Sequence, residues 1–373
     1  MSAYNEILDL LIDAAKHPLR QLQTFKARTG RMAVGCFPEY VPAELVYAAG
    51  MFPIGLWGGQ TEISRAKEYV PAFCCSVLMS GLEYGLNGTY KDLDAVIFPS
   101  LCDTLKCLSQ NFKVAVPAIK HIQFAHPQMR KIEAGVQFLE SEYGRVLSAL
   151  EELSGTKVSD EAIAEAITVF NANRGALRRF VGLSAAHTDV ISPSARHAVI
   201  KSGYFMEKPA HTALVNELCD ALEALPESKK GKRVLLTGIM ADDEAMLRIL
   251  ADCGLAVAAD DLAQETRQFR YDVPEEGGAP LCRLAKWWQI FEGCSLAYDP
   301  EKTRIGMILD EVEKYGVKGV VVCMMKFCDP EEYDYPLLKQ ALEDKGIPAL
   351  YMEIDQNAEA QAQTRIQAFS EII

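Results

Sequence analysis

The chain has 373 residues, a formal net charge of −13, 49% hydrophobic residues and 24% charged residues. This length predicts two or three domains, and the composition is that of an ordinary soluble globular protein. The acidic balance argues against a nucleic-acid or anionic-membrane surface, because such surfaces need clustered Lys and Arg. No stretch reaches the roughly 18 apolar residues of a membrane span, and the N-terminus does not look like a signal peptide. We therefore expect a cytoplasmic protein that binds neither nucleic acid nor membrane.

The first third of the chain predicts helices followed by a parallel sheet. Residues 1–28 form an N-terminal helical segment, because their apolar positions recur at helical spacing. Residues 29–129 form a first α/β domain, in which short apolar runs such as 95–98 are typical of buried strands.

The rest of the chain predicts a helical section and a second sheet. Residues 130–228 carry long helical patterns, one of them opened by a Ser159–Asp160 cap. Strand and helix patterns then alternate through 229–373, where the runs 234–238 and 319–323 are typical of strands and 335–345 of a helix. The expected fold class is α/β, with two Rossmann-like parallel-sheet domains, an N-terminal helical segment and a helical insert between the domains.

Four of the eleven cysteines lie where predicted strands end. Cys102 and Cys107 follow the run 95–98, whereas Cys323 and Cys328 follow the run that begins at residue 319. Both stretches therefore read as a strand followed by C-x4-C, with an acid directly after one cysteine. Ligands gather at the carboxyl ends of parallel strands, so two domains that face each other bring both pairs together. The spacing leaves metal binding and packing open, because C-x4-C is looser than the C-x2-C of zinc ribbons and ferredoxins.

A third source of thiols is the doublet Cys74–Cys75. These residues precede a predicted helix, whose N-terminus favours a thiolate. Three loops that supply thiolates suit an iron–sulfur cluster or zinc. A disulfide framework is not expected, because such frameworks belong to small secreted domains.

Other cysteines and histidines are expected to be structural. Cys219 and Cys253 occupy apolar helical patterns that are typical of core positions. His126 adjoins Pro127, His211 lies two residues after Pro209, and both are expected to have structural roles. The chain contains no G-x-x-x-x-G-K-[ST] loop, no G-x-G-x-x-G after a strand and no G-x-S-x-G elbow. We therefore expect neither ATP hydrolysis nor NAD binding by a standard fingerprint.

Two acidic and aromatic segments, 259–274 and 329–336, leave two interpretations open. The simpler one is a capped helix start with a solvated face. In the other, one group of residues forms a contact surface for a partner or an anionic ligand; its members are Arg267, Gln268, Phe269, Arg270 and Tyr271.

These motifs together resemble the 2-hydroxyacyl-CoA dehydratase family, which is related to the benzoyl-CoA reductase subunits. The resemblance covers nearly the whole chain and is closest to the smaller, β-type subunits, such as those of the 2-hydroxyisocaproyl-CoA and 2-hydroxyglutaryl-CoA dehydratases of amino-acid-fermenting anaerobes. Its motifs are GCFPEYVPAELVYAAGMFPIGLWGGQTE, PAFCCSVLMSGLEYGL, PSLCDTLKCLSQNFK, TGIMADD, DDLAQETRQFRYDVP, EGCSLAYDP and CMMKFCDPEEYDYPLLKQALEDKGIPALYMEID.

The resemblance implies a heterodimer of related subunits, each with a [4Fe–4S] cluster held by three cysteines from separate loops. Aligned by motif, the ligands here are Cys75, Cys102 and Cys328. The lesser candidates are Cys74, Cys107 and Cys323. The doublet leaves the choice between Cys74 and Cys75 open, whereas the resemblance makes Cys107 and Cys323 neighbouring or packing residues. The fourth iron ligand is left open.

The resemblance also implies an activity. An oxygen-sensitive (R)-2-hydroxyacyl-CoA dehydratase, a hydro-lyase, adds one electron to the thioester carbonyl. The resulting ketyl radical expels the 2-hydroxyl group as hydroxide, after which the β-proton becomes acidic. Loss of that proton and return of the electron leave a 2-enoyl-CoA. The electron comes from a separate ATP-hydrolysing iron–sulfur activator, in agreement with the missing nucleotide loop here. The substrate binds chiefly at the α-type subunit, so this chain relays the electron. Some family members are associated with flavin, and the resemblance leaves a flavin in the complex open.

One residue outside the thiols is a candidate for the site. Glu44 lies in the V-P-x-E-L motif that the family's subunits share. Its alternatives are a site-facing acid and a surface or helix-capping residue.

Two further functional readings remain as alternatives. Within the family the chain would be a subunit of a benzoyl-CoA reductase-like enzyme. In another class it would be a zinc-stabilised binding or scaffold protein without a redox role.

Overall fold

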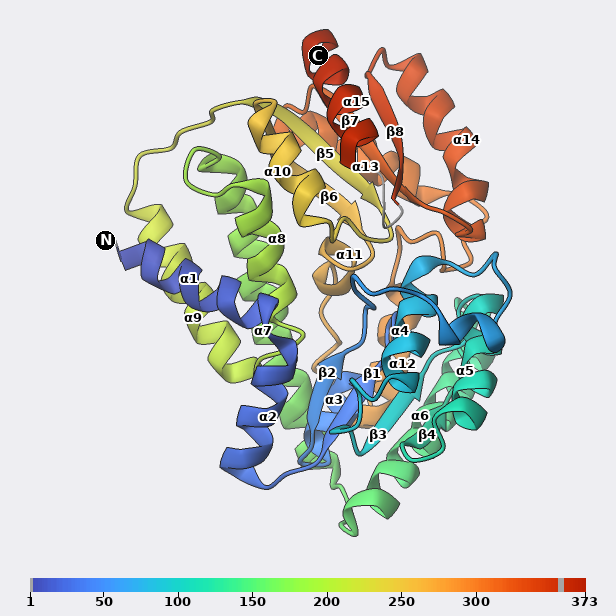
Figure 1. Ribbon diagram of the computed structural model, residues 1–373. Coiled ribbons are helices and arrows are strands. Elements are labelled where there is room, and N and C mark those ends of the chain that lie inside the picture. Colours follow the sequence, from blue (N-terminus) through green and yellow to red (C-terminus); the bar gives the residue numbers. More distant parts are fainter. Residues whose placement is uncertain (1–2, 355–358) are drawn as a thin grey trace.

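The computed structural model describes residues 3–354 and 359–373, whose strands form two four-stranded parallel sheets (Figure 1). The strand orders are β2-β1-β3-β4 and β6-β5-β7-β8, so both sheets have the same topology. This confirms the predicted fold class. The strands are β1 (Ala33–Cys36), β2 (Phe52–Gly55), β3 (Ala95–Phe98), β4 (Lys120–Gln123), β5 (Lys232–Gly238), β6 (Leu255–Leu262), β7 (Gly319–Met325) and β8 (Ala349–Ile354).

Several strands form at short apolar runs, whose side chains are buried on both faces of the sheet. Every residue of β3, β6 and β7 is buried, as is typical of parallel strands covered by helices on both sides. Gly238 ends β5 where it passes β7 closely, because a Cβ atom there would lie 2.2 Å from the carbonyl oxygen of Cys323. Its φ of +144° also suits glycine alone.

The helices fall into three groups along the chain: those of the first α/β part, the helical section and those of the second α/β part. Around the first sheet lie α2 (Pro18–Thr29), α3 (Ala43–Ala48), the 3-10 turn η1 (Arg65–Glu68), α4 (Ser76–Leu86) and α5 (Asp103–Ala115). The N-terminal α1 (Ala3–Lys16) instead packs on the helical section. The helical section contains α6 (Glu133–Ser154), α7 (Asp160–Ala186), α8 (Pro193–Ser202) and α9 (Lys208–Glu223). With the second sheet come α10 (Glu244–Asp252), α11 (Thr266–Phe269), α12 (Pro280–Ile290), α13 (Thr303–Tyr315), α14 (Asp329–Asp344) and α15 (Glu359–Ile372).

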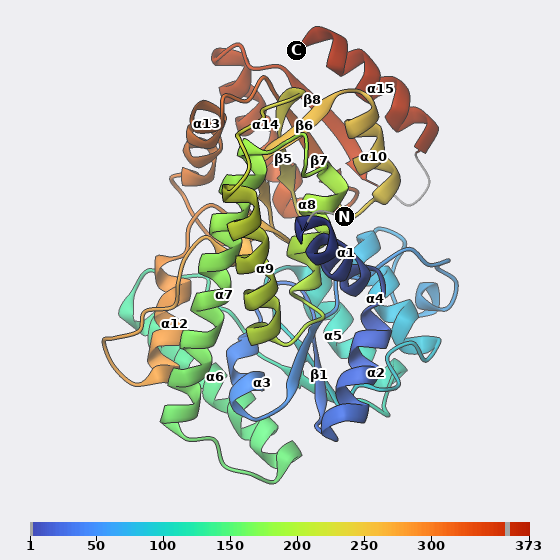
Figure 2. The ribbon, with the colours of Figure 1, turned by 90° about the vertical axis from the view of Figure 1, so that its left-hand side faces the viewer.

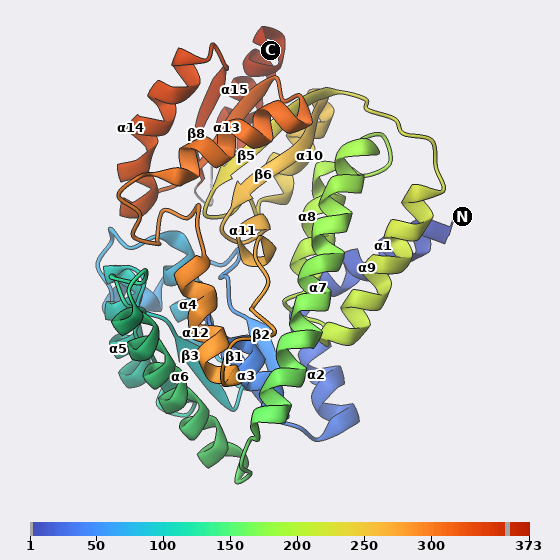
Figure 3. The ribbon, with the colours of Figure 1, turned by 180° about the vertical axis from the view of Figure 1, so that it is seen from behind.

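Long helices tie the two sheets together. Helix α7 packs on α9 and runs beside both sheets, as Figure 2 shows. The predicted cap at its start is present, because the Ser159 hydroxyl accepts the N–H of Ala162 at 3.3 Å. Helix α12 follows the second sheet's first two strands along the chain, yet it packs on α6 and α7 beside the first sheet (Figure 3). The exact domain boundaries remain a prediction.

None of the helices in the described part of the chain combines the length and the apolar character that a membrane span needs.

Candidate functional site

Three thiols at three helix N-termini line one cavity. Cys75 is the N-cap of α4, Cys102 the N-cap of α5 and Cys328 the N-cap of α14. All three border the same cavity of about 610 Å³, which therefore lies between the two halves of the molecule. Cys102 and Cys328 follow β3 and β7, so the carboxyl ends of these strands are directed toward a common site.

The lesser candidates lie elsewhere. Cys74 is buried next to Cys75, Cys107 is exposed on α5, and Cys323 is fully buried within β7. None of them is among the described residues that line the thiol cavity. The geometry thus groups the same three thiols as the motif alignment, and their role as iron ligands stays a prediction.

The apparent duplication of C-x4-C is out of register. Cys102 follows the third strand of its sheet, and Cys328 occupies the equivalent place after the third strand of the second sheet. Cys102, the first cysteine of its pair, therefore corresponds to Cys328, the second cysteine of the other pair. Helix α14 also begins at Asp329, directly after Cys328 and earlier than the predicted residue 335. This early start is what places Cys328 at a helix N-terminus.

Burial keeps these thiols protonated in the free chain. It raises the pKa of Cys75 to about 12 and that of Cys102 to about 11, and it raises the pKa of Cys328 well above the ordinary value. Backbone N–H groups act in the opposite direction, and that of Leu105 reaches the Cys102 sulfur at 3.4 Å. Deprotonation of these thiols therefore requires a strongly bound cation or cluster. Once thiolates form, the partial positive charge of the helix N-termini stabilises them.

The donor set fits an iron–sulfur cluster. Such clusters take thiolate ligands from separate positions, one for each iron atom. Within residues 3–354 and 359–373, no three His, Cys, Asp or Glu side chains are grouped tightly enough to hold a single metal ion. The three thiols come from three separate loops and border one cavity, which is the kind of donor set that an iron–sulfur cluster uses.

One buried carboxyl borders the same cavity and was missed from the sequence. Glu39, just after β1, is 3% exposed, and its Oε2 atom has no hydrogen-bond partner among the residues that the structure describes. Burial raises the pKa of Glu39 to about 8, although Arg267 and Arg304 lower it. Burial therefore favours the neutral form of this carboxyl at pH 7. Its position in GCFPEY, directly after a predicted strand, was the available signal.

A network of buried charges holds the start of α14. Glu331, three residues after Cys328, accepts hydrogen bonds from Arg267 at 3.0 Å, Arg304 at 2.8 Å and Ser295 at 2.7 Å. Asp261 at the end of β6 accepts from both arginines, at 2.9 and 2.8 Å. Burial opposes ionisation, yet the arginines hold the pKa of Asp261 and of Glu331 below their ordinary values. The network therefore stays ionised and links four elements behind Cys328.

The alternative contact surface at residues 267–271 is wrong for two of its five members, Arg267 and Phe269, and stays a prediction for the half-buried Gln268, Arg270 and Tyr271. Arg267 is 0% exposed and Phe269 is 3% exposed, and both side chains point into the protein. The solvated-face interpretation of 329–336 is also wrong in part, since Glu331 and Asp334 are buried. The polar composition of these segments concealed a charge network whose partners come from distant parts of the chain.

Glu44 is neither on the surface nor at the thiol cavity. It lies in the first turn of α3, 3% exposed, and forms an ion pair with Arg174 of α7. It borders a separate cavity of about 130 Å³, together with Lys208. The structure therefore gives Glu44 an internal role that ties α3 to the helical section.

Two of the residues that were expected to be structural are inside the protein. Cys219 is fully buried on α9. His211 is fully buried and shares a 2.8 Å hydrogen bond with Asn173.

Comparison with known proteins identifies relatives over the full length. The chain is 45% identical to the lactoyl-CoA dehydratase subunit beta of Anaerotignum propionicum and 43% identical to the (R)-phenyllactyl-CoA dehydratase beta subunit of Clostridium sporogenes, with 100% of each chain covered. Identity to a benzoyl-CoA reductase subunit of Thauera aromatica is 25%, over 92% of this chain and 90% of that protein.

The family described as 2-hydroxyglutaryl-CoA dehydratase, D-component, matches residues 38–373, a range that includes all three site thiols. The chain belongs to this family.

Proposed function

We propose that this chain is the β subunit of a 2-hydroxyacyl-CoA dehydratase and that it holds a [4Fe–4S] cluster through Cys75, Cys102 and Cys328. The observation that carries the proposal is the meeting of three helix N-cap thiols at one cavity between two sheets of equal topology. The names of the full-length relatives support the dehydratase assignment and an α-type partner.

The chain's own residues prepare a thiolate site inside the protein. Three helix N-termini point partial positive charge at the sulfurs, and apolar side chains such as Leu101 and Met325 border the same cavity. Such surroundings limit solvent access, which is one of the factors that set a cluster's potential. A bound cluster supplies one-electron transfer at low potential.

The chain's part in the reaction is electron delivery to the partner. The proposed reaction is elimination of water from an (R)-2-hydroxyacyl-CoA through a ketyl radical, with the substrate bound chiefly by the α-type subunit. An ATP-hydrolysing iron–sulfur protein is the proposed electron donor, because this chain has no nucleotide-binding loop of its own. The neutral Glu39 and the ionised network at Glu331 then tune the polarity around the thiols.

The proposal is tested on the chain produced together with its α-type partner, without oxygen. The complex is supplied with a strong artificial reductant and a series of (R)-2-hydroxyacyl-CoA thioesters, and 2-enoyl-CoA formation is followed. We expect dehydration that Cys328→Ser abolishes while the two subunits still assemble. Reduction of benzoyl-CoA without dehydration would favour the benzoyl-CoA reductase-like alternative, and full activity of the Cys328→Ser complex would contradict the proposed site.

A further inference from the structure

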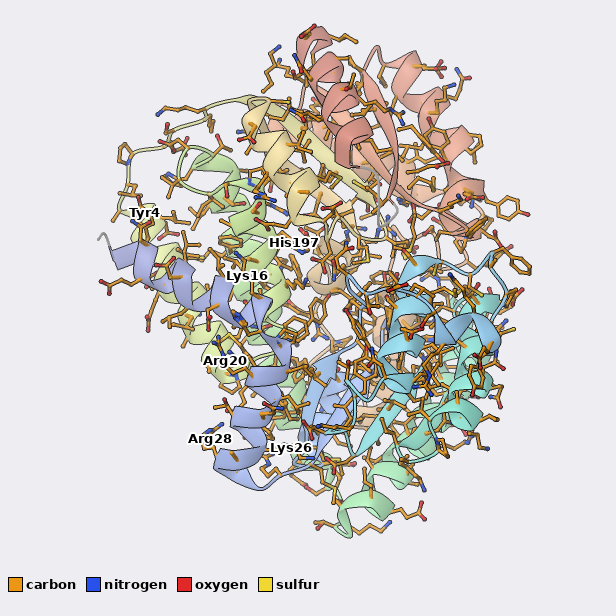
Figure 4. All side chains as sticks on the ribbon, in the orientation of Figure 1. Tyr4, Lys16, Arg20, Lys26, Arg28 and His197 are labelled. Carbon is orange, nitrogen blue, oxygen red and sulfur yellow. The ribbon has the colours of Figure 1, made fainter. Side chains whose placement is uncertain are left out.

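A second cavity, of about 470 Å³, shares no described lining residue with the thiol cavity. It is a half-open pocket bordered by the end of α1, the start of α2, residues 54–59 at and after the end of β2, and α8. Figure 4 shows Lys16 on α1 and His197 on α8, two of its lining residues, at the same face of the molecule. Small-molecule sites occupy about 300–1,000 Å³. The size of this cavity is therefore that of a ligand site.

The lining is rich in aromatic side chains. Trp57, Tyr84, Tyr90 and Phe205 all border the cavity, together with leucines of α2 and of the segment after β2. Trp57, Tyr90 and Phe205 are 5–7% exposed, so these rings are fixed by packing on the protein side. Aromatic walls bind flat rings through stacked and edge-to-face contacts. This lining favours a ligand with an aromatic ring.

Two opposite charges at the edge of the cavity, on the exposed side chains of Lys16 and Glu244, have no partner among the described residues. The other charged residues at this cavity are paired: Asp242 binds His197 at 2.9 Å and Lys201 at 2.5 Å. By contrast, the ammonium of Lys16 and the side-chain carboxylate of Glu244 form no ion pair or hydrogen bond with any residue in 3–354 or 359–373. A ligand that complements both carries a carboxylate and an ammonium group.

We propose that this cavity binds an aromatic α-amino acid, with its ring among Trp57, Tyr84, Tyr90 and Phe205. The ligand's carboxylate is recognised by Lys16 and its ammonium group by Glu244. Tyr84 belongs to α4, the helix that begins after Cys75, so an occupied cavity contacts a helix that positions one of the site thiols. The inference uses none of the three thiols and does not depend on the proposed cluster.

The test is a calorimetric titration of the full-length chain with L-phenylalanine. The companion probes are 3-phenylpropionate, which lacks the ammonium group, phenethylamine, which lacks the carboxylate, and L-alanine, which lacks the ring. We expect L-phenylalanine to bind with one-to-one stoichiometry, each of the two truncated aromatic probes to bind more weakly, and L-alanine not to bind.

Variants locate the site and separate its parts. Lys16→Gln and Glu244→Gln are surface changes, and each should weaken L-phenylalanine binding about two- to fivefold, as expected for an exposed ion pair. Lys16→Gln should leave phenethylamine binding unchanged, and Glu244→Gln should leave 3-phenylpropionate binding no weaker. Ala198→Phe, which places a ring in the cavity, should abolish binding, whereas Lys67→Gln, an exposed control away from the cavity, should have no effect.

The proposal is overturned if L-phenylalanine does not bind the wild-type chain. It is also overturned if folded Ala198→Phe protein binds L-phenylalanine as wild type does, or if 3-phenylpropionate and phenethylamine both bind as tightly as the amino acid. Folding of every variant is checked by its thermal unfolding profile, and the two surface variants keep the test decisive if Ala198→Phe does not fold.

Discussion

The two sheets have the same strand order, but their sides of the site are supported by different chemistry. Around the first sheet, Phe37 stacks on Phe98 with ring centroids 4.0 Å apart, and Phe112 packs against both. Behind Cys328 in the second sheet, Arg267 and Arg304 instead join Asp261 to Glu331 in a buried network. The shared topology thus places Cys102 and Cys328 at equivalent positions. The side chains packed behind Cys102 are apolar, whereas those behind Cys328 are charged.

The largest expected effect comes from removing a site thiol, either beside the first sheet or beside the second. Cys102→Ala and Cys328→Ala should each remove most of the bound iron and all dehydratase activity, because both thiols are proposed ligands. Iron content and activity are measured on the complex purified without oxygen. Cys107→Ala is the matched control on α5 and should retain both. Equal iron content in Cys328→Ala and wild type would refute the claim that Cys328 binds iron as Cys102 does.

The ionic support of the second half is broken by Arg267→Met. This variant removes one of the positive charges that balance the buried carboxylates of Asp261 and Glu331. Breaking a buried ion pair costs about 3–5 kcal/mol. We expect the free energy of unfolding in urea to fall by that amount. The control is Arg179→Met, which removes a surface arginine paired with Asp220 and Glu223 and should cost about 0–1 kcal/mol. Similar losses in both variants would mean that the buried network does not support α14.

The link between the helical section and the second half should depend on pH. On α8, His197 hydrogen-bonds Glu265 at 2.7 Å and Asp242 at 2.9 Å. Burial disfavours its charge, but the two carboxylates raise the pKa of His197 to about 9, above its ordinary value of 6.5. The folded state thus holds the proton more tightly, so the stabilisation is complete below pH 6.5 and is lost as the pH rises through about 9.

The effect is measured as a difference between wild type and His197→Gln in urea unfolding at pH 6 and pH 9.5. The stability advantage of wild type should shrink by up to about 3 kcal/mol at the higher pH, since each pKa unit corresponds to about 1.4 kcal/mol. Titration of the other groups changes the stability of both proteins alike, so it cancels in the difference between wild type and His197→Gln. An advantage that stays constant with pH would show that His197 is not held protonated.

A smaller and more local effect concerns the free thiols. In cluster-free protein at pH 8, the thiolate fraction of Cys102 should be about a hundredfold below that of a thiol with the ordinary pKa of 9.0, because its own pKa is about 11. Iodoacetamide labelling followed by peptide mass spectrometry gives the rate at each cysteine. The exposed Cys107 of the same helix is the internal reference. Labelling of both residues at equal rates would contradict the buried, protonated state of the site.

The fold was predictable because it follows from local patterns. Continuous apolar runs such as 95–98 and 319–325 mark strands buried on both faces, and helical spacing between them predicts crossover helices. The three thiols were predictable from the motifs that resemble a family, whereas their spacing alone left metal binding and packing open.

The support around the thiols could not be predicted from the sequence. Arg267, Arg304 and Glu331 are polar residues in polar segments, and only tertiary contacts between residues 27 to 64 positions apart bury them together. The cavity of Trp57 and Lys16 likewise joins residues that share no motif. Such arrangements depend on how the elements pack, which local periodicity does not specify.

The most direct test of the central claim is the iron, sulfide and zinc content of this chain purified without oxygen. The account predicts about four iron and four sulfide per chain, the content of one [4Fe–4S] cluster. It further predicts that both fall together in the Cys75→Ala variant. Stoichiometric zinc with no sulfide would contradict the cluster and leave the zinc-stabilised binding protein as the better account of the three thiols.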